Sequence, residues 1–111
     1  MPSYTAPVKD TQFILHEVLK VTASGIPGYA DLEADFTGAV LEEAGKICSE
    51  VLAPLNWTGD QNPSHLLNGE VITTPGFKEA FQQFGEAGWQ GVIHPVEFGG
   101  QGFPKAIATP C

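Results

Sequence analysis

The fold is decided by residues 31–55, which read DLEADFTGAVLEEAGKICSEVLAPL. Apolar side chains recur there at helical spacing, and those at positions 41, 44, 48, 51 and 55 form one continuous stripe. We expect Asp31 to cap this helix, and Pro54 to end or kink it. Gly38 and Gly45 each cost up to about 1 kcal/mol against alanine in a helix. Their presence predicts close packing on a neighbouring helix.

Two further helices are predicted on either side of this one. Apolar residues at helical spacing indicate a helix over residues 11–22, capped by Asp10 and preceded by an extended arm over residues 1–9. A third helix is expected to begin with Thr74 as its cap and Pro75 at its first position. Gly88 is placed to stop it.

The remaining segments are rich in turn-forming residues. Residues 56–69 predict a surface loop, followed by one short extended segment over residues 70–73. Glycines and prolines exclude a regular helix over 89–104, and Pro104 begins a last, short one. The sequence therefore predicts an all-α fold with three main helices, long loops and at most one short extended segment. The fourth helix is cut short, which indicates a truncated chain.

Composition excludes several classes of function. The chain has 111 residues, of which 13 are acidic and 5 are lysines, and it contains no arginine. A net charge of −8 argues against binding to nucleic acid or to an anionic membrane. No apolar run reaches the length of a membrane span, and the first residues do not form a signal peptide. Two cysteines cannot form a disulfide framework, so a cytoplasmic location is expected.

No catalytic, cofactor or metal site can be assembled from the candidate residues. His16, His65 and His94 lie in separate segments without zinc-ligand spacing. Cys48 lies on the apolar stripe, which favours a small buried side chain over a nucleophile. Glu42 and Glu43 indicate a solvated helix face, with Lys46 four residues from Glu42.

The aromatic and glycine clusters also favour structural interpretations. Core packing is expected of the phenylalanines at positions 77, 81 and 84, in preference to a ligand platform. The cluster Gly99–Gly102 lacks a phosphate-loop pattern and predicts a tight loop where two backbones approach. Glu97, just before it, is one carboxylate without a partner for acid–base chemistry.

Two segments carry a resemblance to a known family. Residues 88–92, GWQGV, and residues 95–104, PVEFGGQGFP, resemble the acyl-CoA dehydrogenases. Residues 3–19 are similar to the amino-terminal extension of a bacterial branch of that family, which includes 3-methylmercaptopropionyl-CoA dehydrogenases. Residues 51–60 and 73–80 fit the same branch. Trp57 departs from the pattern, because related chains commonly have a basic residue there.

The resemblance implies a domain division and a reaction. It implies an amino-terminal extension over residues 1–34 and a partial helical amino-terminal domain over residues 35–111. The whole enzyme would dehydrogenate the Cα–Cβ bond of an acyl-CoA with FAD, pass electrons to an electron-transfer flavoprotein and form homo-oligomers. Its base and flavin residues would follow residue 111, so this chain alone is expected to bind no FAD and to be inactive.

One loop could contribute to substrate access under this resemblance. It consists of Glu97, Phe98, Gly99, Gly100, Gln101 and Gly102, and would shape the approach to the acyl pocket. The alternative is a stand-alone helical interaction module without catalysis. Its apolar patch would then include Phe98, Phe103 and Ile107.

Overall fold

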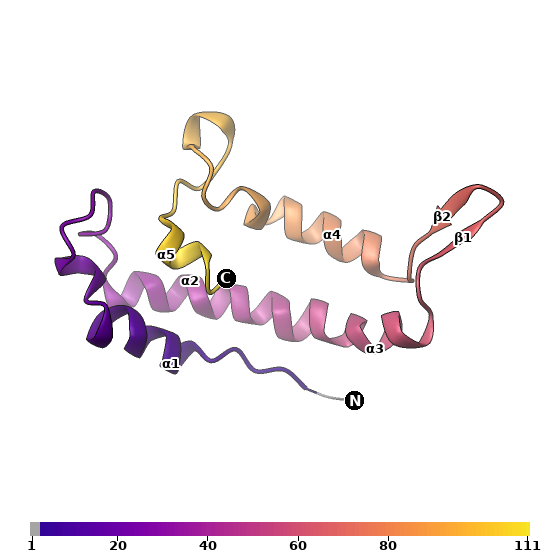
Figure 1. Cartoon of the computed structure of the whole chain (residues 1–111), viewed down its shortest axis with the longest axis horizontal. Helices are drawn as coiled ribbons and strands as arrows, with labels where there is room; N and C mark the ends of the chain where they lie inside the picture. Colours follow the sequence, from indigo (N-terminus) through magenta and orange to yellow (C-terminus); the bar gives the residue numbers. More distant parts are fainter. Residues whose placement is uncertain (1–2) are drawn as a thin grey trace.

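The computed structural model describes residues 3–111 (Figure 1). The helices and strands, in chain order, are α1 (Val8–Phe13), α2 (Ala34–Ile47), α3 (Ala53–Gln61), β1 (His65–Leu67), β2 (Glu70–Ile72), α4 (Phe77–Glu86) and α5 (Lys105–Ala108). Helices dominate, and the only sheet within the described range is a short antiparallel hairpin. The predicted all-α fold is therefore confirmed.

The apolar stripe forms one continuous helical rod from α2 to α3. The two helices are joined by a π-helical turn over Cys48–Leu52, so the rod passes through Pro54 instead of ending there. A π-helical turn shifts the hydrogen-bond register, which accommodates a residue that lacks a backbone N–H. The cap was also predicted wrongly. Glu33, not Asp31, precedes the first turn, and no side chain caps it.

The first helix begins earlier than predicted and ends earlier too. It starts at Val8, so Asp10 lies inside it instead of capping it. A π-helical turn extends it to Val18, and the left-handed backbone of Lys20 (φ 48°) then breaks it before a short 3-10 turn. Of the predicted arm, residues 3–7 form neither helix nor strand, and residues 1 and 2 lie outside the described range.

Helix α1 packs along the first half of α2 through a polar cluster. The buried Thr37 hydroxyl lies 2.6 Å from Gln12 Oε1 and 2.7 Å from His16 Nε2. Gln12 also donates to the carbonyl of Ala34. A Cβ on Gly38 would come within 2.8 Å of the Gln12 amide, which confirms the predicted close packing. The other glycine, Gly45, faces Ala6 of the arm and not a helix.

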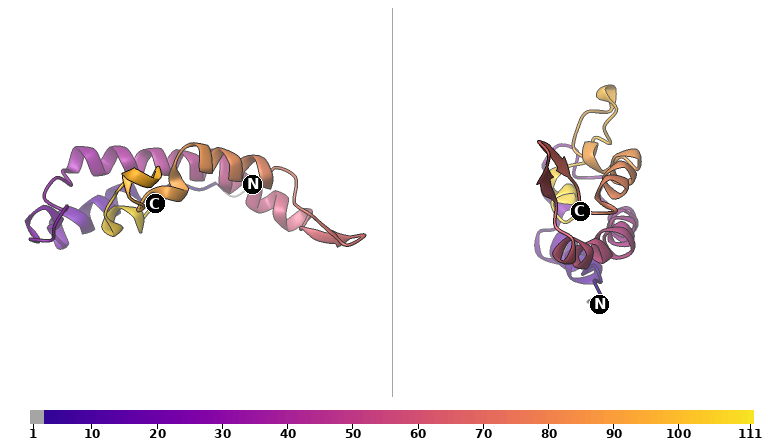
Figure 2. Two further views of the ribbon diagram at one scale, coloured as in Figure 1. Left: turned by 90° about the horizontal axis from the view of Figure 1, so that it is seen from above. Right: turned by 90° about the vertical axis from the view of Figure 1, so that its right-hand side faces the viewer.

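The predicted loop over residues 56–69 is partly helical and partly strand. Helix α3 continues to Gln61, and β1 pairs with the predicted extended segment, which is β2. Asn68 and Gly69 connect the strands with positive φ angles of 52° and 82°. Two consecutive positive φ angles are typical of the tight turn that Asn-Gly favours. The hairpin projects from one end of the molecule (Figures 1 and 2).

The third helix confirms its predicted stop but not its predicted start. Gly88 has a left-handed backbone just after α4, as expected of a helix terminator. Thr74 does not cap the helix: its buried hydroxyl donates to the carbonyl of Asn62 at 2.8 Å, and Gly76 takes the cap position. Pro104 likewise precedes α5 as its cap residue and is not its first helical residue.

The hydrophobic core lies at one end of the molecule. It consists of Leu15, Val21, Leu32, Leu41 and Ile107. These residues come from the π-helical turn that extends α1, the 3-10 turn after it, the loop before α2, α2 itself and α5, so the predicted extension (1–34) and domain (35–111) share a single core. Ile107 is fully buried although α5 is only one turn long.

The molecule is a thin plate. It measures 55 × 35 × 16 Å, with a radius of gyration of 17.0 Å (Figure 2). A compact domain of this length would have a radius of gyration of about 13 Å. The accessible surface is 7755 Å². This is about 1,800 Å² more than a compact monomer of this mass exposes. Much of the apolar surface of these helices is therefore not covered by residues 3–111.

Candidate functional site

An apolar groove lies between α3 and α4, and we call it the α3–α4 groove. Its volume is about 770 Å³, and its surface is formed almost wholly by carbon. The residues that line it are Leu52, Leu55, Asn56, Thr73, Phe77, Lys78, Ala80, Phe81 and Phe84. A groove of this size and composition suits an apolar ligand or an apolar peptide face.

The phenylalanines of α4 form one wall of this groove. Phe77 and Phe81 are 40% and 67% exposed, and Phe84 is half-buried. The prediction that these side chains are core residues is therefore wrong for Phe77 and Phe81, while Phe84 is partly covered. Helical spacing correctly places them on one face of α4, but no segment of the described chain covers that face. The sequence shows the apolar residues of both groove walls. No local sequence pattern indicates that these two walls lie opposite each other.

The glycine loop is a tight turn closed by backbone hydrogen bonds. The amides of Gly100, Gly102 and Phe103 donate to the carbonyls of Pro95, His94 and Val92 at 3.1, 2.9 and 2.8 Å. A Cβ on Gly100 would collide with the backbone of His94. The predicted close approach of two backbones is confirmed, and it explains why this position is a glycine.

The side chains of the same loop point mostly to solvent. Phe98 is 81% exposed, and Glu97 is exposed too. Gln101 lines a second cavity of about 310 Å³ together with Phe36 and Trp89. None of the residues from Glu97 to Gly102 lines the α3–α4 groove. A role for this loop in access to an acyl pocket stays a prediction.

The apolar patch predicted for an interaction module does not form. Ile107 is fully buried in the core. Phe103 is half-buried and makes an edge-to-face contact with Phe36, with ring centroids 5.5 Å apart. Only Phe98 of the predicted set is highly exposed. Other exposed apolar side chains lie along the groove, on the hairpin and on the first helix and its π-helical turn, where Phe13, Ile14 and Val18 are 50–60% exposed.

The two cysteines share a small cavity between α2 and the end of the chain. Cys48 and Cys111 are both half-buried and line a space of about 210 Å³ with Ala6 and Ala44. Burial raises the pKa of the Cys111 thiol, and the neighbouring Cys48 raises it further. A raised pKa keeps the Cys111 thiol protonated, so Cys111 lacks the activation of a nucleophile. Cys48 is less buried than predicted.

The histidines form no metal centre. His16 hydrogen-bonds across the helices to the Thr37 hydroxyl. His65 is exposed and lies 3.2 Å from the carbonyl of Pro63, and His94 is exposed. Across residues 3–111, no group of three or more histidine, cysteine or acidic residues could hold a metal ion.

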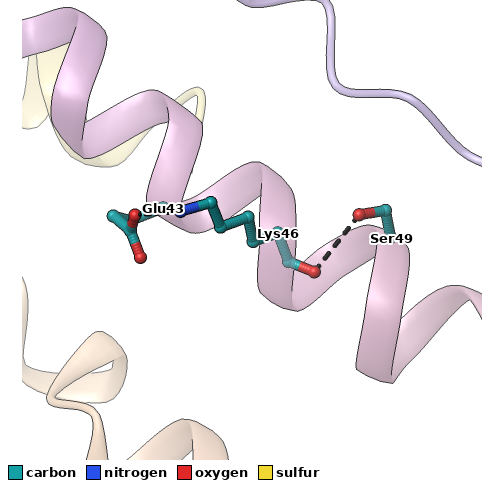
Figure 3. Close-up of polar contacts among 3 residues, drawn as sticks. All are labelled: Glu43, Lys46 and Ser49. Atoms are coloured by element: carbon teal, nitrogen blue, oxygen red, sulfur yellow. Dashed lines mark hydrogen bonds and ion pairs between the residues drawn. The ribbon is translucent and has the colours of Figure 1, made fainter.

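The charged residues of α2 form a surface feature and not a site. Lys46 pairs with Glu43 at 2.6 Å, not with Glu42 as predicted, while Ser49 donates to the Lys46 carbonyl at 3.2 Å (Figure 3). The hydrogen bond and charge of Glu43 raise the pKa of Lys46. Both side chains are more than 60% exposed, so the pair is solvated.

No helix within the described part of the chain combines the length and the apolar character needed to cross a bilayer.

Comparison with known proteins shows which proteins the chain is similar to. No protein-family model matches the chain. The 3-methylmercaptopropionyl-CoA dehydrogenase of Ruegeria pomeroyi is 39% identical over 108 residues. The broad-specificity linear acyl-CoA dehydrogenase FadE5 of Mycobacterium tuberculosis is 31% identical over 110 residues.

Both alignments include 96% of this chain but only 18% of each relative. The chain therefore spans about a fifth of the length of the curated relatives it matches, and the matched part is their amino-terminal part. The resemblance inferred from the glycine-rich segments and the extension is confirmed over nearly the whole chain.

Proposed function

We propose that this chain, which is related to the acyl-CoA dehydrogenases over nearly its whole length, is the amino-terminal helical part of such an enzyme. The observation that carries the proposal is the 39% identity over 108 residues. The whole enzyme would dehydrogenate the α,β bond of an acyl-CoA thioester with FAD as cofactor. It would act as a homo-oligomer and pass electrons to an electron-transfer flavoprotein.

The residues of this chain do not fit a flavin dinucleotide. A diphosphate needs positive charge or convergent backbone amides, but all five lysines are exposed, and Lys78 alone lines the α3–α4 groove. The polar edge of a flavin ring needs several hydrogen-bond partners, and the groove surface is almost entirely carbon. We therefore place the FAD site and the catalytic base outside these 111 residues and expect the chain alone to be inactive.

The contribution of this part to the enzyme is structural. The core of α1, α2 and α5 fixes the long α2–α3 rod, and the rod supports α4 and the glycine loop. Under this proposal the loop from Glu97 to Gly102 shapes the approach to the acyl pocket. The exposed face of α4 meets later parts of the enzyme.

The proposal is tested on the gene product isolated from its native cells. Intact mass is measured first, followed by flavin absorbance and its bleaching by acyl-CoA thioesters without oxygen. We expect a mass several-fold above 11.8 kDa and bleaching by at least one thioester. A series of linear and thioether acyl chains would then define the substrate.

The second candidate is a stand-alone interaction module. It is favoured by the accessible surface of the chain, which is about 1,800 Å² larger than that of a compact monomer of the same mass. A binding partner would cover this additional surface. A native mass of 11.8 kDa without flavin would contradict the enzyme proposal and support this one. Size-exclusion chromatography would then show whether the chain associates with itself.

A further inference from the structure

Two cysteines that are far apart in the sequence meet at one cavity beside the core. Cys48 continues the face of α2 that carries Leu41 and Ala44, and all three residues line a space of about 210 Å³. Cys111 reaches the same cavity from the segment after α5, where it packs against the core. Figure 1 shows this residue next to α2. The fold therefore brings together two thiols that are separated by more than half of the chain.

The residues around the two thiols leave them room to approach each other. Ala6, Ala44 and Gly45 line the same cavity, and their small side chains leave the space between the sulfur atoms unfilled. Each sulfur is one rotatable bond away from its backbone, so a change of rotamer moves it across that space. The thiols are already close enough for the charge of Cys48 to raise the pKa of the Cys111 thiol.

Only Cys48 also lines a second, more polar cavity. This space of about 340 Å³ lies between the arm and the α2–α3 rod, and Ser3, Tyr4 and Asn56 contribute to its lining. A small polar molecule can therefore reach Cys48 from one cavity while Cys111 lies on the other. This arrangement gives the two thiols different roles in a reaction.

We propose that Cys48 and Cys111 form a reversible dithiol site, which a small-molecule disulfide such as glutathione disulfide oxidises to an internal cross-link. The proposal goes beyond the enzyme activity proposed above and does not depend on it. A single reversible pair also differs from the disulfide framework that the two cysteines cannot form.

The oxidation consists of two thiol–disulfide exchange steps. In the first, the Cys48 thiolate attacks one sulfur of glutathione disulfide. A bond forms from Cys48 to that sulfur, the original disulfide bond breaks, and one glutathione leaves. In the second, the Cys111 thiolate attacks Cys48 Sγ, the two Sγ atoms become bonded, and the second glutathione leaves. The two protein thiols lose two electrons and two protons, and the two glutathiones gain them.

The cross-link would restrain the closed end of the molecule. It would join α2 to the segment after α5 and enclose α3, the hairpin, α4 and the glycine loop in one covalent ring. Such a ring lowers the conformational entropy of the unfolded chain and so stabilises the folded one. It would also hold in place Ile107, which a helix of one turn carries into the core.

A redox titration of the gene product isolated from its native cells tests the proposal. The protein is equilibrated without oxygen in mixtures of reduced and oxidised glutathione, quenched with acid and treated with N-ethylmaleimide to block free thiols. Trypsin cleaves after Lys46, Lys78 and Lys105, so the cysteines fall in two peptides, residues 47–78 and the peptide that begins at Ala106. We expect these peptides to be joined in a fraction that rises with the share of oxidised glutathione.

The folded structure should favour the link. In the same glutathione mixture, the ratio of joined to open peptides should be at least about tenfold higher in the folded protein than in guanidinium, because folding raises the effective concentration of one thiol at the other. Amides of α5 should exchange with deuterium at least about tenfold more slowly in the oxidised protein than in the reduced one.

Two matched substitutions assign the steps. Cys111→Ser removes the second thiol, so Cys48 should stop as a mixed disulfide with glutathione. Cys48→Ser leaves only the protonated thiol of Cys111, which should form its mixed disulfide at least about tenfold more slowly. Both substitutions exchange one sulfur for one oxygen, and neither variant should form the joined peptides.

Four outcomes would overturn the proposal. The two peptides are never joined, or they join as readily in guanidinium as in the folded protein. Peptide 47–78 is instead joined to a copy of itself, which would indicate a link between two chains. Exchange in α5 is the same in both redox states, which would show that the link restrains nothing. None of these measurements involves flavin or acyl-CoA, so failure here is distinguishable from failure of the proposed enzyme activity.

Discussion

The two ends of the plate differ in whether they contain a hydrophobic core. At the closed end, Leu15, Leu41 and Ile107 are at most 5% exposed, although Phe13, Ile14 and Val18 of the first helix and its π-helical turn are 50–60% exposed. At the open end, formed by α3, the hairpin and α4, only Thr74 and Ala80 are buried over residues 53–86. Both ends are built from amphipathic elements. The difference shows that the spacing of apolar residues along an element produces an apolar face. Whether that face is buried depends on another segment that packs against it.

The largest difference between the ends is expected for truncation of a leucine. Leu41→Ala should destabilise the chain by about 2–5 kcal/mol, because it leaves a cavity in the core. Leu66→Ala in the hairpin should change stability by less than about 0.5 kcal/mol, because Leu66 is 71% exposed. Urea unfolding followed by circular dichroism measures both. Equal losses would contradict the division into a closed and an open end.

Two glycine substitutions should have opposite signs. Gly100→Ala should cost about 1–3 kcal/mol, because the new Cβ would collide with the His94 backbone. Gly85→Ala should stabilise α4 by up to about 1 kcal/mol, because its Cβ would meet only the Gln90 side chain at an ordinary 3.6 Å. Thermal melting of the two variants beside the parent chain decides the sign. A neutral Gly100→Ala would disprove the tight loop.

The polar cluster between α1 and α2 should contribute a smaller amount. Thr37→Val removes the buried hydroxyl that contacts Gln12 and His16, and should cost about 1 kcal/mol. The matched control is Thr58→Val in α3, where the half-buried hydroxyl makes one 3.4 Å bond to Pro54. That control should be close to neutral in the same unfolding measurement. A larger loss from Thr58→Val than from Thr37→Val would reverse the comparison.

The smallest expected effect is a pH dependence at Cys111. Burial favours the neutral thiol and raises its pKa in the folded chain. The stability that this group contributes is therefore complete below the ordinary thiol pKa of about 8.5, and is lost as pH rises through the raised value. Alkylation rates across pH, in a Cys48→Ala variant, report the Cys111 thiolate. The midpoint should be higher in the folded chain than in guanidinium, and an unchanged midpoint would argue against burial.

The sequence predicted correctly those elements that are determined by a pattern of a few neighbouring residues. The spacing of Leu41, Ala44 and Cys48 predicted α2, Gly88 predicted the end of α4, and Gly99–Gly102 predicted a tight loop. Pro54 does not end the helix, one of the two outcomes expected of it, because the π-helical turn over Cys48–Leu52 accommodates it, and that turn depends on backbone geometry several residues away. Strand β1 was missed because its residues resemble a loop until they pair with β2.

The candidate site was harder to predict from the sequence than the fold. Periodicity placed Phe77 and Phe81 on one face of α4, and their interpretation as core assumed that the covering partner lies within the chain. The groove exists because Leu52 of the π-helical turn and Leu55 of α3 face them while no described segment lies between. The resemblance carried by residues 88–104 identified the related family, but that family information says little about which faces of this part are covered.

Hydrogen exchange of the 111-residue chain, resolved by peptide, tests the division into a closed and an open end. We expect slow exchange for amides of α1 and of α2 around Leu41. Exchange should be at least tenfold faster for the hairpin and for α4 around Phe81, although all are hydrogen-bonded in the structure. Equal protection at both ends would disprove this division, because the open end would then be stable without anything to cover it.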